Sequence, residues 1–236
     1  MARISEIFGG PPGLRWNVGR RVLQVASAYV LIALLLFIPA GSARWPAAWV
    51  YMVLYLAVIA AGAFMLPVDV ISERGSVKEN VEKWDRLITG LLFVSSLGVF
   101  PVAGFDRRFS WTKGLGPWLT ACSCVIFLLG CALDLWAMYA NRYFSTSVRI
   151  QSERGHTVCE AGPYRIVRHP GYLGMILYNA AGPTLLGSLW ALVPAAMTAV
   201  LFVLRASLED KTLRRKLAGY EEYANRVRWR LIPRIW

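Results

Sequence analysis

Charged residues are scarce in this sequence, and their scarcity argues against a soluble protein. Asp, Glu, Lys and Arg make up 17% of the 236 residues, whereas 56% are hydrophobic and the mean hydropathy is +0.45. Long apolar runs take up about half of the chain, which leaves no room for a large soluble domain. The runs are Val22–Ala40, Pro46–Leu66, Leu87–Phe105, Pro117–Ala140 and Gly171–Leu204. The composition therefore predicts an all-α, polytopic membrane protein.

Features that would indicate several other classes of protein are absent. No Gly-x-Gly-x-x-Gly motif occurs, so a nucleotide-binding site of the soluble Rossmann type is not expected. Only four cysteines are present, and three of them lie within one apolar run. A Cys-x-Cys pair on a helix points its two thiols about 200° apart. We therefore expect neither a disulfide framework nor a metal site.

The basic residues are distributed unevenly along the chain. The net charge is +12 and the pI is about 10.0, but Lys and Arg lie between the apolar runs rather than in one domain, which argues against a nucleic-acid partner. If the N-terminus is cytoplasmic and residues 171–204 cross twice as a helical hairpin, 22 of the 26 basic residues are cytoplasmic. The positive-inside rule therefore predicts about six spans with both termini cytoplasmic. We expect the first run to remain as a span, because it is longer than the core of a signal peptide.

The cytoplasmic segment 141–170 is rich in glycine, proline, basic and aromatic residues. Gly162, Gly171 and Gly174 would let the backbone approach a ligand closely. The side chains that offer hydrogen-bond donors and aromatic faces are Tyr164, Arg168, His169 and Tyr172. These properties suit a site for a small charged ligand. The alternative is that the same residues only anchor a helix end at the membrane interface.

Two charged residues follow the predicted hairpin on the same side of the membrane. Arg205 and Glu209 are four residues apart, so they share one side of a helix that continues past Leu204. They would then lie near the His169-Pro170 segment. An ordinary ion pair at a helix end is the alternative interpretation. Asp134 lies within a span, and we expect it to pair with Arg142 or another basic group near the inner interface.

Four motifs of the C-terminal part occur together. They are Gln151 with His156-Thr157-Val158, then Gly162-Pro163-Tyr164-Arg165-x-Val167-Arg168-His169-Pro170-x-Tyr172-x-Gly174, then Arg205-x3-Glu209, and finally Gly219-Tyr220-x2-Tyr223. From about Asn141 to its end, the chain resembles the isoprenylcysteine carboxyl methyltransferase family and related phospholipid methyltransferases. These are integral-membrane enzymes that use S-adenosyl-L-methionine. The resemblance divides the chain into a four-span membrane region, 1–140, and a methyltransferase core, 141–236.

The resemblance also implies which residues form the site. Cofactor contacts would fall on Gln151, His156, Thr157, Val158, Cys159, Tyr164, Arg168, His169, Pro170, Gly171 and Tyr172. Arg205 and Glu209 would line the site of methyl transfer as catalytic residues. A sulfonium cation is well accommodated beside aromatic faces, which Tyr164 or Tyr172 could supply.

The methyl acceptor stays open between two chemistries. A carboxylate is ionised at pH 7 and needs only orientation by a cation such as Arg205, whereas an amine must lose a proton to a base such as Glu209 or Asp134. We expect carboxyl O-methylation, of the isoprenylcysteine type, of a hydrophobic or lipid-like molecule at the cytoplasmic face. The alternative is a phospholipid amine N-methyltransferase. Membrane lipids are the other expected partners.

Two further classes fit the sequence less well. An NADPH-dependent sterol-type reductase would have Asn and Glu where this chain has Gly171 and Met175. A transporter would place polar residues near the bilayer midplane. Apart from Asp134, the apolar runs hold no charged residue, and the polar chemistry gathers at the inner face. This distribution favours an interfacial enzyme.

Overall fold

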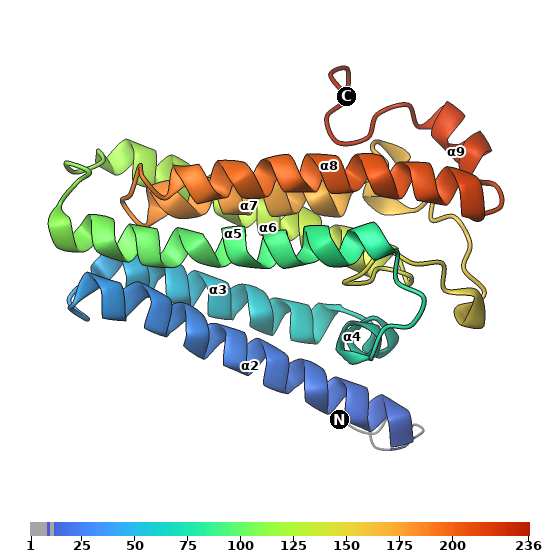
Figure 1. The fold of residues 1–236 in the computed structure, drawn as a ribbon, viewed down its shortest axis with the longest axis horizontal. Coiled ribbons are helices and arrows are strands. Elements are labelled where there is room, and N and C mark those ends of the chain that lie inside the picture. The colour runs from blue at the N-terminus through green and yellow to red at the C-terminus, as the bar shows by residue number, and fades with distance from the viewer. Residues whose placement is uncertain (1–8, 10–11) are drawn as a thin grey trace.

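The structure, a computed structural model, describes residue 9 and residues 12–236, and all regular elements in these residues are helices. Figure 1 shows the long helices lying side by side. In chain order the elements are α2 (Pro12–Ala40), α3 (Pro46–Met65), α4 (Val68–Gly75), α5 (Lys83–Phe109), α6 (Pro117–Ala140), the 3-10 turns η1 (Ser152–Arg154) and η2 (Gly162–Arg165), α7 (Pro170–Leu185), α8 (Leu192–Lys216) and α9 (Tyr220–Arg226). The predicted all-α architecture is confirmed.

Five of these helices, α2, α3, α5, α6 and α8, are long and apolar enough to cross a membrane. The expected hairpin is present as α7 and α8, and the turn between them includes Gly187 with φ +82°. However, α7 has only 16 residues and a length of about 24 Å, less than the hydrocarbon thickness of about 30 Å. The chain is thus a multi-pass membrane protein with five full-length spans and a shorter helix where the sequence predicted a sixth.

The short helix α7 is held along α6 by a very close backbone contact. A Cβ atom built at Gly174 would lie 2.6 Å from the Gly130 carbonyl oxygen, and one built at Gly130 would lie 2.7 Å from the Tyr178 nitrogen. Only glycine permits this approach. The prediction that Gly174 allows a close approach is correct, but its neighbour is α6. Because of this contact, the N-terminal end of α7 and the loop before it have a fixed position.

The bundle has two different ends (Figure 1). The turn regions 41–45, 110–116 and 186–191 lie at one end, and α4, α9, the start of α2, the C-terminus and the loop 141–169 lie toward the other, here called the loop end. Towards the turn end, the interior is solidly packed. The side chains that are at most 1% exposed there include Leu36, Ala48, Ala103, Phe127 and Leu185. Towards the loop end, the helices surround a cavity.

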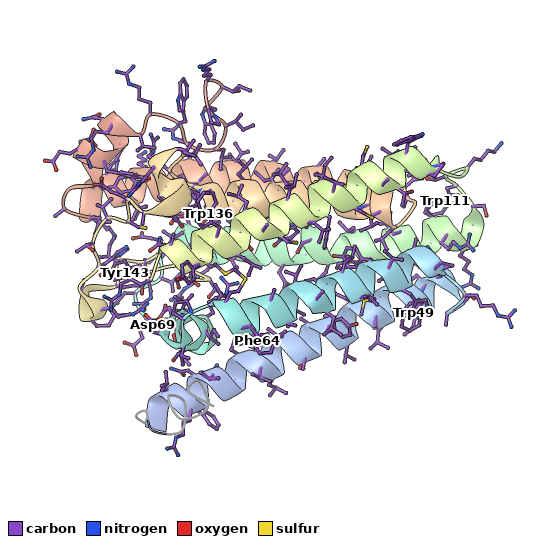
Figure 2. The ribbon with its side chains drawn as sticks, turned by 180° about the vertical axis from the view of Figure 1, so that it is seen from behind. Trp49, Phe64, Asp69, Trp111, Trp136 and Tyr143 are labelled. Carbon is purple, nitrogen blue, oxygen red and sulfur yellow. The ribbon has the colours of Figure 1, made fainter. Side chains whose placement is uncertain are left out.

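Large apolar side chains cover the outside of the bundle. Trp49, Phe64 and Trp136 are 51%, 81% and 49% exposed, and Figure 2 shows them on the outer surface. In water such a surface would be unfavourable, but against lipid tails it carries no such penalty. The surface therefore supports the same conclusion as the helix lengths.

Candidate active site

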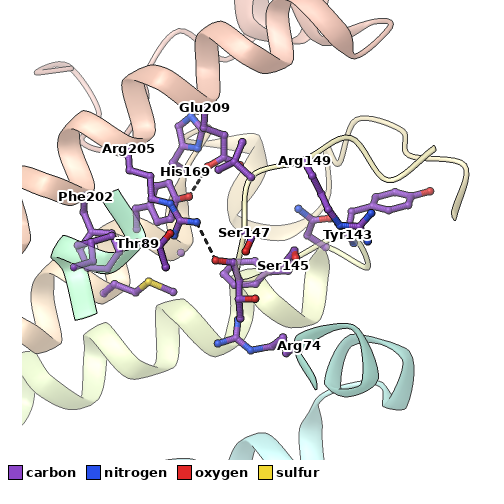
Figure 3. A pocket seen from close by; sticks show the side chains of 18 of the residues that line it. Arg74, Thr89, Tyr143, Ser145, Ser147, Arg149, His169, Phe202, Arg205 and Glu209 are labelled. Carbon is purple, nitrogen blue, oxygen red and sulfur yellow. Dashed lines mark hydrogen bonds between the residues drawn. The ribbon is translucent and has the colours of Figure 1, made fainter. Parts of the chain in front are cut away.

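A cavity of about 460 Å³ lies at the loop end, between the loop 141–169 and the halves of the helices nearest to that loop. All residues predicted for the site line it, except Pro170. Pro170 is buried and forms the first turn of α7. Figure 3 shows Arg205 and Glu209 reaching from α8 towards the loop. The structure thus brings the predicted residues together, while their roles stay predictions.

Gln151 organises the loop from inside. Its side chain is fully buried, donates from Nε2 to the Tyr143 carbonyl over 2.6 Å, and accepts at Oε1 from Arg154. Its backbone N–H donates to Nδ1 of His156 over 3.3 Å. Because its amide group has partners on both sides, Gln151 fixes the course of the chain past the cavity.

His156 is kept neutral by its surroundings. Its ring packs against the ring of Tyr143 at 4.6 Å between centroids. Burial, together with the positive charges of Arg149 and Arg154, lowers the pKa of His156 to about 4. At neutral pH the ring therefore carries no charge, and Nδ1 acts as the acceptor that the Gln151 N–H requires.

Arg168 holds the C-terminal segment against the loop. Its Nε and Nη2 donate to the two carboxylate oxygens of Asp210 over 2.7 and 3.1 Å, and Nη1 donates to the carbonyls of Val227 and Arg228. Asp210 also accepts from the Tyr220 hydroxyl. This buried, bidentate pair uses all three guanidinium nitrogens of Arg168 within the protein.

An aromatic wall stands between the loop and α8. The rings of His169 and Tyr172 lie almost parallel with centroids 5.7 Å apart, and Phe202 packs against Tyr172 at 5.6 Å. The Tyr172 hydroxyl donates to the carboxylate of Glu209. Nε2 of His169 is buried and lies 3.6 Å from Oδ1 of Asp210, slightly beyond hydrogen-bond distance. This wall therefore presents a carboxylate and ring faces to one cavity.

Arg205 is bound to the N-terminal half of the chain. Its Nε and Nη2 donate to the carboxylate of Asp85 over 2.8 and 3.2 Å, and Nη2 also donates to the Thr146 carbonyl over 2.9 Å. The guanidinium carbon lies 5.4 Å from the centre of the Tyr172 ring. Asp85 is fully buried and accepts the backbone N–H of Val148 as well. Asp85 therefore joins α5, α8 and the loop.

Residues 67–86 also contribute to the site, although no motif of the sequence assigned them a role. The segment forms α4 and the start of α5, and it places Arg74 in the cavity wall and Asp85 beside Arg205. Glu73 binds the loop by accepting from Ser145 and Arg149, and it also accepts from Lys78 of its own segment. One feature of the sequence could have indicated the pair with Arg205. Asp85 lies just before the third apolar run, on the side of the membrane where Arg205 is also expected.

The pairing expected between Asp134 and Arg142 is not formed. Arg142 lies over the ring of Tyr143 instead, 5.5 Å from its centre. Asp134 makes no ion pair within the described residues, and its Oδ1 is buried without a hydrogen-bond partner. The alternative expectation was that another basic group pairs with Asp134. Arg74 of α4 is a basic group whose charge acts on Asp134, but the two side chains form no ion pair within the described residues.

Comparison with known proteins supports the resemblance of the C-terminal part. Residues 122–215, from α6 almost to the end of α8, match the Isoprenylcysteine carboxyl methyltransferase (ICMT) family. A rice protein (Oryza sativa subsp. indica) named "Probable protein-S-isoprenylcysteine O-methyltransferase" is 36% identical over 92 residues, 37% of this chain and 47% of that protein. "Protein-S-isoprenylcysteine O-methyltransferase B" of Arabidopsis thaliana is 28% identical over 144 residues, 60% of this chain and 68% of that protein. The chain thus spans about half the length of the rice relative. The family whose model matches this region is the one that the motifs resemble.

Proposed function

We propose that this protein is an integral-membrane methyltransferase that transfers a methyl group from S-adenosyl-L-methionine to the carboxyl group of a lipid-like acceptor. The observation that carries the proposal is the continuity of one cavity. Its polar side is the loop and the start of α7, within the region that matches the family, and its apolar side lies among α2, α3 and α5. A cavity of this kind would let a polar donor and an apolar acceptor meet.

The polar side has the groups that the cofactor requires. The carboxylate of Glu209 suits an ammonium or ribose hydroxyl. The faces of Tyr172 and Phe202 suit a sulfonium cation. When bound, S-adenosyl-L-methionine supplies an electrophilic methyl group. A volume of about 460 Å³ lies in the usual range of small-molecule sites, about 300–1,000 Å³.

Two of the predicted cofactor residues act by positioning in our proposal. The donors of Arg168 are used by Asp210 and by backbone carbonyls, so this side chain fixes the neighbouring His169. The amide of Gln151 is used by Tyr143 and Arg154, so it shapes the loop. In this proposal, the residues that contact the cofactor directly are those whose polar atoms face the cavity.

The apolar side of the cavity, which we call the apolar chamber, is lined by Ile32, Tyr51, Leu92, Leu97 and Phe100. It is closed towards the turn end, because Leu36, Ala48 and Ala103, the next inward-facing residues of the same helices, are fully buried. We propose that the hydrophobic tail of the acceptor lies here. Burying each methylene group of that tail would contribute about 0.8 kcal/mol.

The proposal assigns different tasks to the two parts of the chain. The core 141–236 would hold the cofactor, and 1–140 would supply most of the apolar chamber. The loop end would face the cytoplasm, and we propose that both chain termini are cytoplasmic. The uneven distribution of basic residues, 22 of 26 on that side, supports this orientation.

The experiment uses the full chain in lipid nanodiscs with radiolabelled S-adenosyl-L-methionine. The acceptors offered are N-acetyl-S-farnesylcysteine and, separately, phosphatidylethanolamine. We expect base-labile incorporation, the signature of a methyl ester, into the prenylcysteine alone, and binding of S-adenosylhomocysteine by calorimetry. Incorporation only into phosphatidylethanolamine would make the protein an amine methyltransferase. Binding of NADPH without the homocysteine derivative would overturn the methyltransferase class.

A further inference from the structure

Arg74 is a basic residue of the cavity wall that has no acidic partner among the residues described by the structure. It lies at the end of α4, outside the region that matches the family, and it is one of the residues lining the cavity. Its Nη1 is buried without a hydrogen-bond partner, and the guanidinium makes no ion pair with any described residue. Its one ring contact is with Phe144, whose centre lies 5.6 Å away.

The other arginines of the cavity wall are neutralised by acidic residues. Arg205 is paired with Asp85, Arg168 with Asp210, and Arg149 with Glu73 and Glu153. The carboxylate next to Arg74 in sequence, Glu73, accepts from Lys78 and Arg149 instead. Within the described residues, Arg74 is therefore the arginine of the wall whose positive charge has no acidic partner.

A partly buried guanidinium without an anion is energetically unfavourable, so its presence calls for an explanation. Asp134 is the acidic group on which its charge acts, but the two form no ion pair, and Oδ1 of Asp134 has no hydrogen-bond partner either. Contact with the Phe144 ring leaves the N–H donors of Arg74 free for another group. A guanidinium in this state is ready to bind a carboxylate.

The position of Arg74 is where the polar and apolar sides of the cavity meet. Its charge acts on Tyr55, which lines the cavity from α3, and its ring partner Phe144 belongs to the loop. Figure 3 shows Arg74 on the α4 side of segment 144–147, with Arg205 and Glu209 coming from α8. The head group of an amphiphile whose tail fills the apolar chamber would reach this point.

We propose, building on the function proposed above, that Arg74 binds the carboxylate of the methyl acceptor. The acceptor is then an anionic amphiphile, and amine head groups are disfavoured by the unpaired positive charge. One carboxylate oxygen forms the new C–O bond, while the C–S bond of the donor breaks and leaves its electron pair on sulfur. No proton is transferred, so no general base is needed.

The test compares Arg74→Gln and Arg74→Lys with the wild type in nanodiscs. For Arg74→Gln we expect the KM of N-acetyl-S-farnesylcysteine to rise ten- to a hundredfold, while the Kd of S-adenosylhomocysteine changes less than twofold. Arg74→Lys should recover part of the loss. Arg142→Gln is the matched control, because Arg142 also lies over a ring of the loop but does not line the cavity. It should leave both constants unchanged.

Inhibition by the carboxamide of the same prenylcysteine gives a second measurement. The wild type should bind the acid at least tenfold more tightly than the amide, and Arg74→Gln should lose this preference. Equal KM values in the wild type and Arg74→Gln, or an equal loss of acceptor and S-adenosylhomocysteine binding, would overturn the role of Arg74 while leaving the methyltransferase proposal intact. Absence of methyl transfer to any acceptor by the wild type would overturn the proposed function instead.

Unfolding of Arg74→Gln is also informative. If Arg74 only neutralises Asp134, the variant should melt lower than the wild type, and adding Asp134→Asn should restore both the melting temperature and the KM. Restoration of KM by Asp134→Asn would contradict acceptor binding by Arg74. If Arg74→Gln does not fold, Arg74→Lys replaces it in the comparison of acid and carboxamide binding. A preference for the acid equal to that of the wild type would then contradict acceptor binding by the Arg74 guanidinium.

Discussion

The two halves of this chain contribute to the cavity in opposite ways. The C-terminal half carries the recognisable motifs, and its polar groups are connected to one another through Asp210, Gln151 and Glu209. The N-terminal half has no motif, yet it lines the apolar chamber and provides charged residues that reach the loop, namely Glu73, Arg74 and Asp85. A region without a motif can therefore supply part of a site, and here that part is the one that would recognise the acceptor.

The difference follows from the tasks that we propose for each half. A cofactor of fixed structure requires a fixed set of polar contacts, and such contacts leave a pattern in the sequence. An apolar tail requires only space and apolar walls, which many sequences can provide. Substitutions in the two halves should therefore affect different constants, namely cofactor binding in one case and acceptor choice in the other.

The largest effect is expected where the halves are joined, at Asp85. Asp85→Ala leaves the buried Arg205 without its acidic partner and also removes the acceptor of the Val148 N–H. Loss of one member of a buried ion pair costs about 3–5 kcal/mol, so the melting temperature should fall sharply. Asp69→Ala is the control, because the Asp69–Arg154 pair is half exposed and is worth at most about 1 kcal/mol. Equal melting temperatures for the two variants would show that the halves are held together elsewhere.

The second effect concerns the C-terminal half alone. Glu209→Gln removes the negative charge that accepts the Tyr172 hydroxyl and faces the cofactor side of the cavity. A hydrogen bond to a charged group is worth about 1.5–3 kcal/mol, so the Kd of S-adenosylhomocysteine should rise about 10- to 100-fold. Glu222→Gln, an exposed change on α9, is the control. An increase confined to the KM of the acceptor would contradict the division of tasks.

Much of this arrangement could be predicted from the sequence because it depends on local patterns. Hydropathy located the long helices, and the i, i+4 spacing placed Arg205 and Glu209 on one side of α8. Asp85 and Arg74 could not be assigned in this way, because their role depends on residues far away in the chain. Arg205 and Asp85, for example, are 120 residues apart. A sixth span was predicted because the apolar pattern continues through the turn after Leu185, where α7 ends.

The third effect concerns the closed end of the apolar chamber. Phe100 packs edge-on against Tyr51 with ring centroids 5.6 Å apart, and both line the cavity. Phe100→Ala should lengthen the chamber and raise kcat/KM for a geranylgeranyl relative to a farnesyl acceptor about tenfold. Such a change needs about 1.4 kcal/mol, less than two methylene groups supply. Phe100→Leu is a milder variant, in case the alanine variant unfolds.

Phe93→Ala is the matched control for chain length. Phe93 also lines the cavity, but it is 60% exposed on the outside of the bundle and does not close the chamber. It should leave the ratio of the two acceptors unchanged. If both variants changed the ratio of kcat/KM for the two acceptors equally, the N-terminal half would not determine which tail length is accepted.

The smallest effect is a dependence of stability on pH within the loop. Burial and two arginines lower the pKa of His156 from 6.5 to about 4, so the folded state favours the neutral ring. The stabilisation is present above pH 6.5, where the unfolded chain is also neutral, and is lost as the pH falls from 6.5 to 4, because only the unfolded chain then gains the proton. Since the ring is partly open to water, we expect about 1 kcal/mol. Melting curves of the wild type and His156→Asn from pH 7.5 to 4.5 measure it by difference. The two curves should converge at low pH if the loop owes stability to the neutral imidazole, and a constant gap would show that it does not.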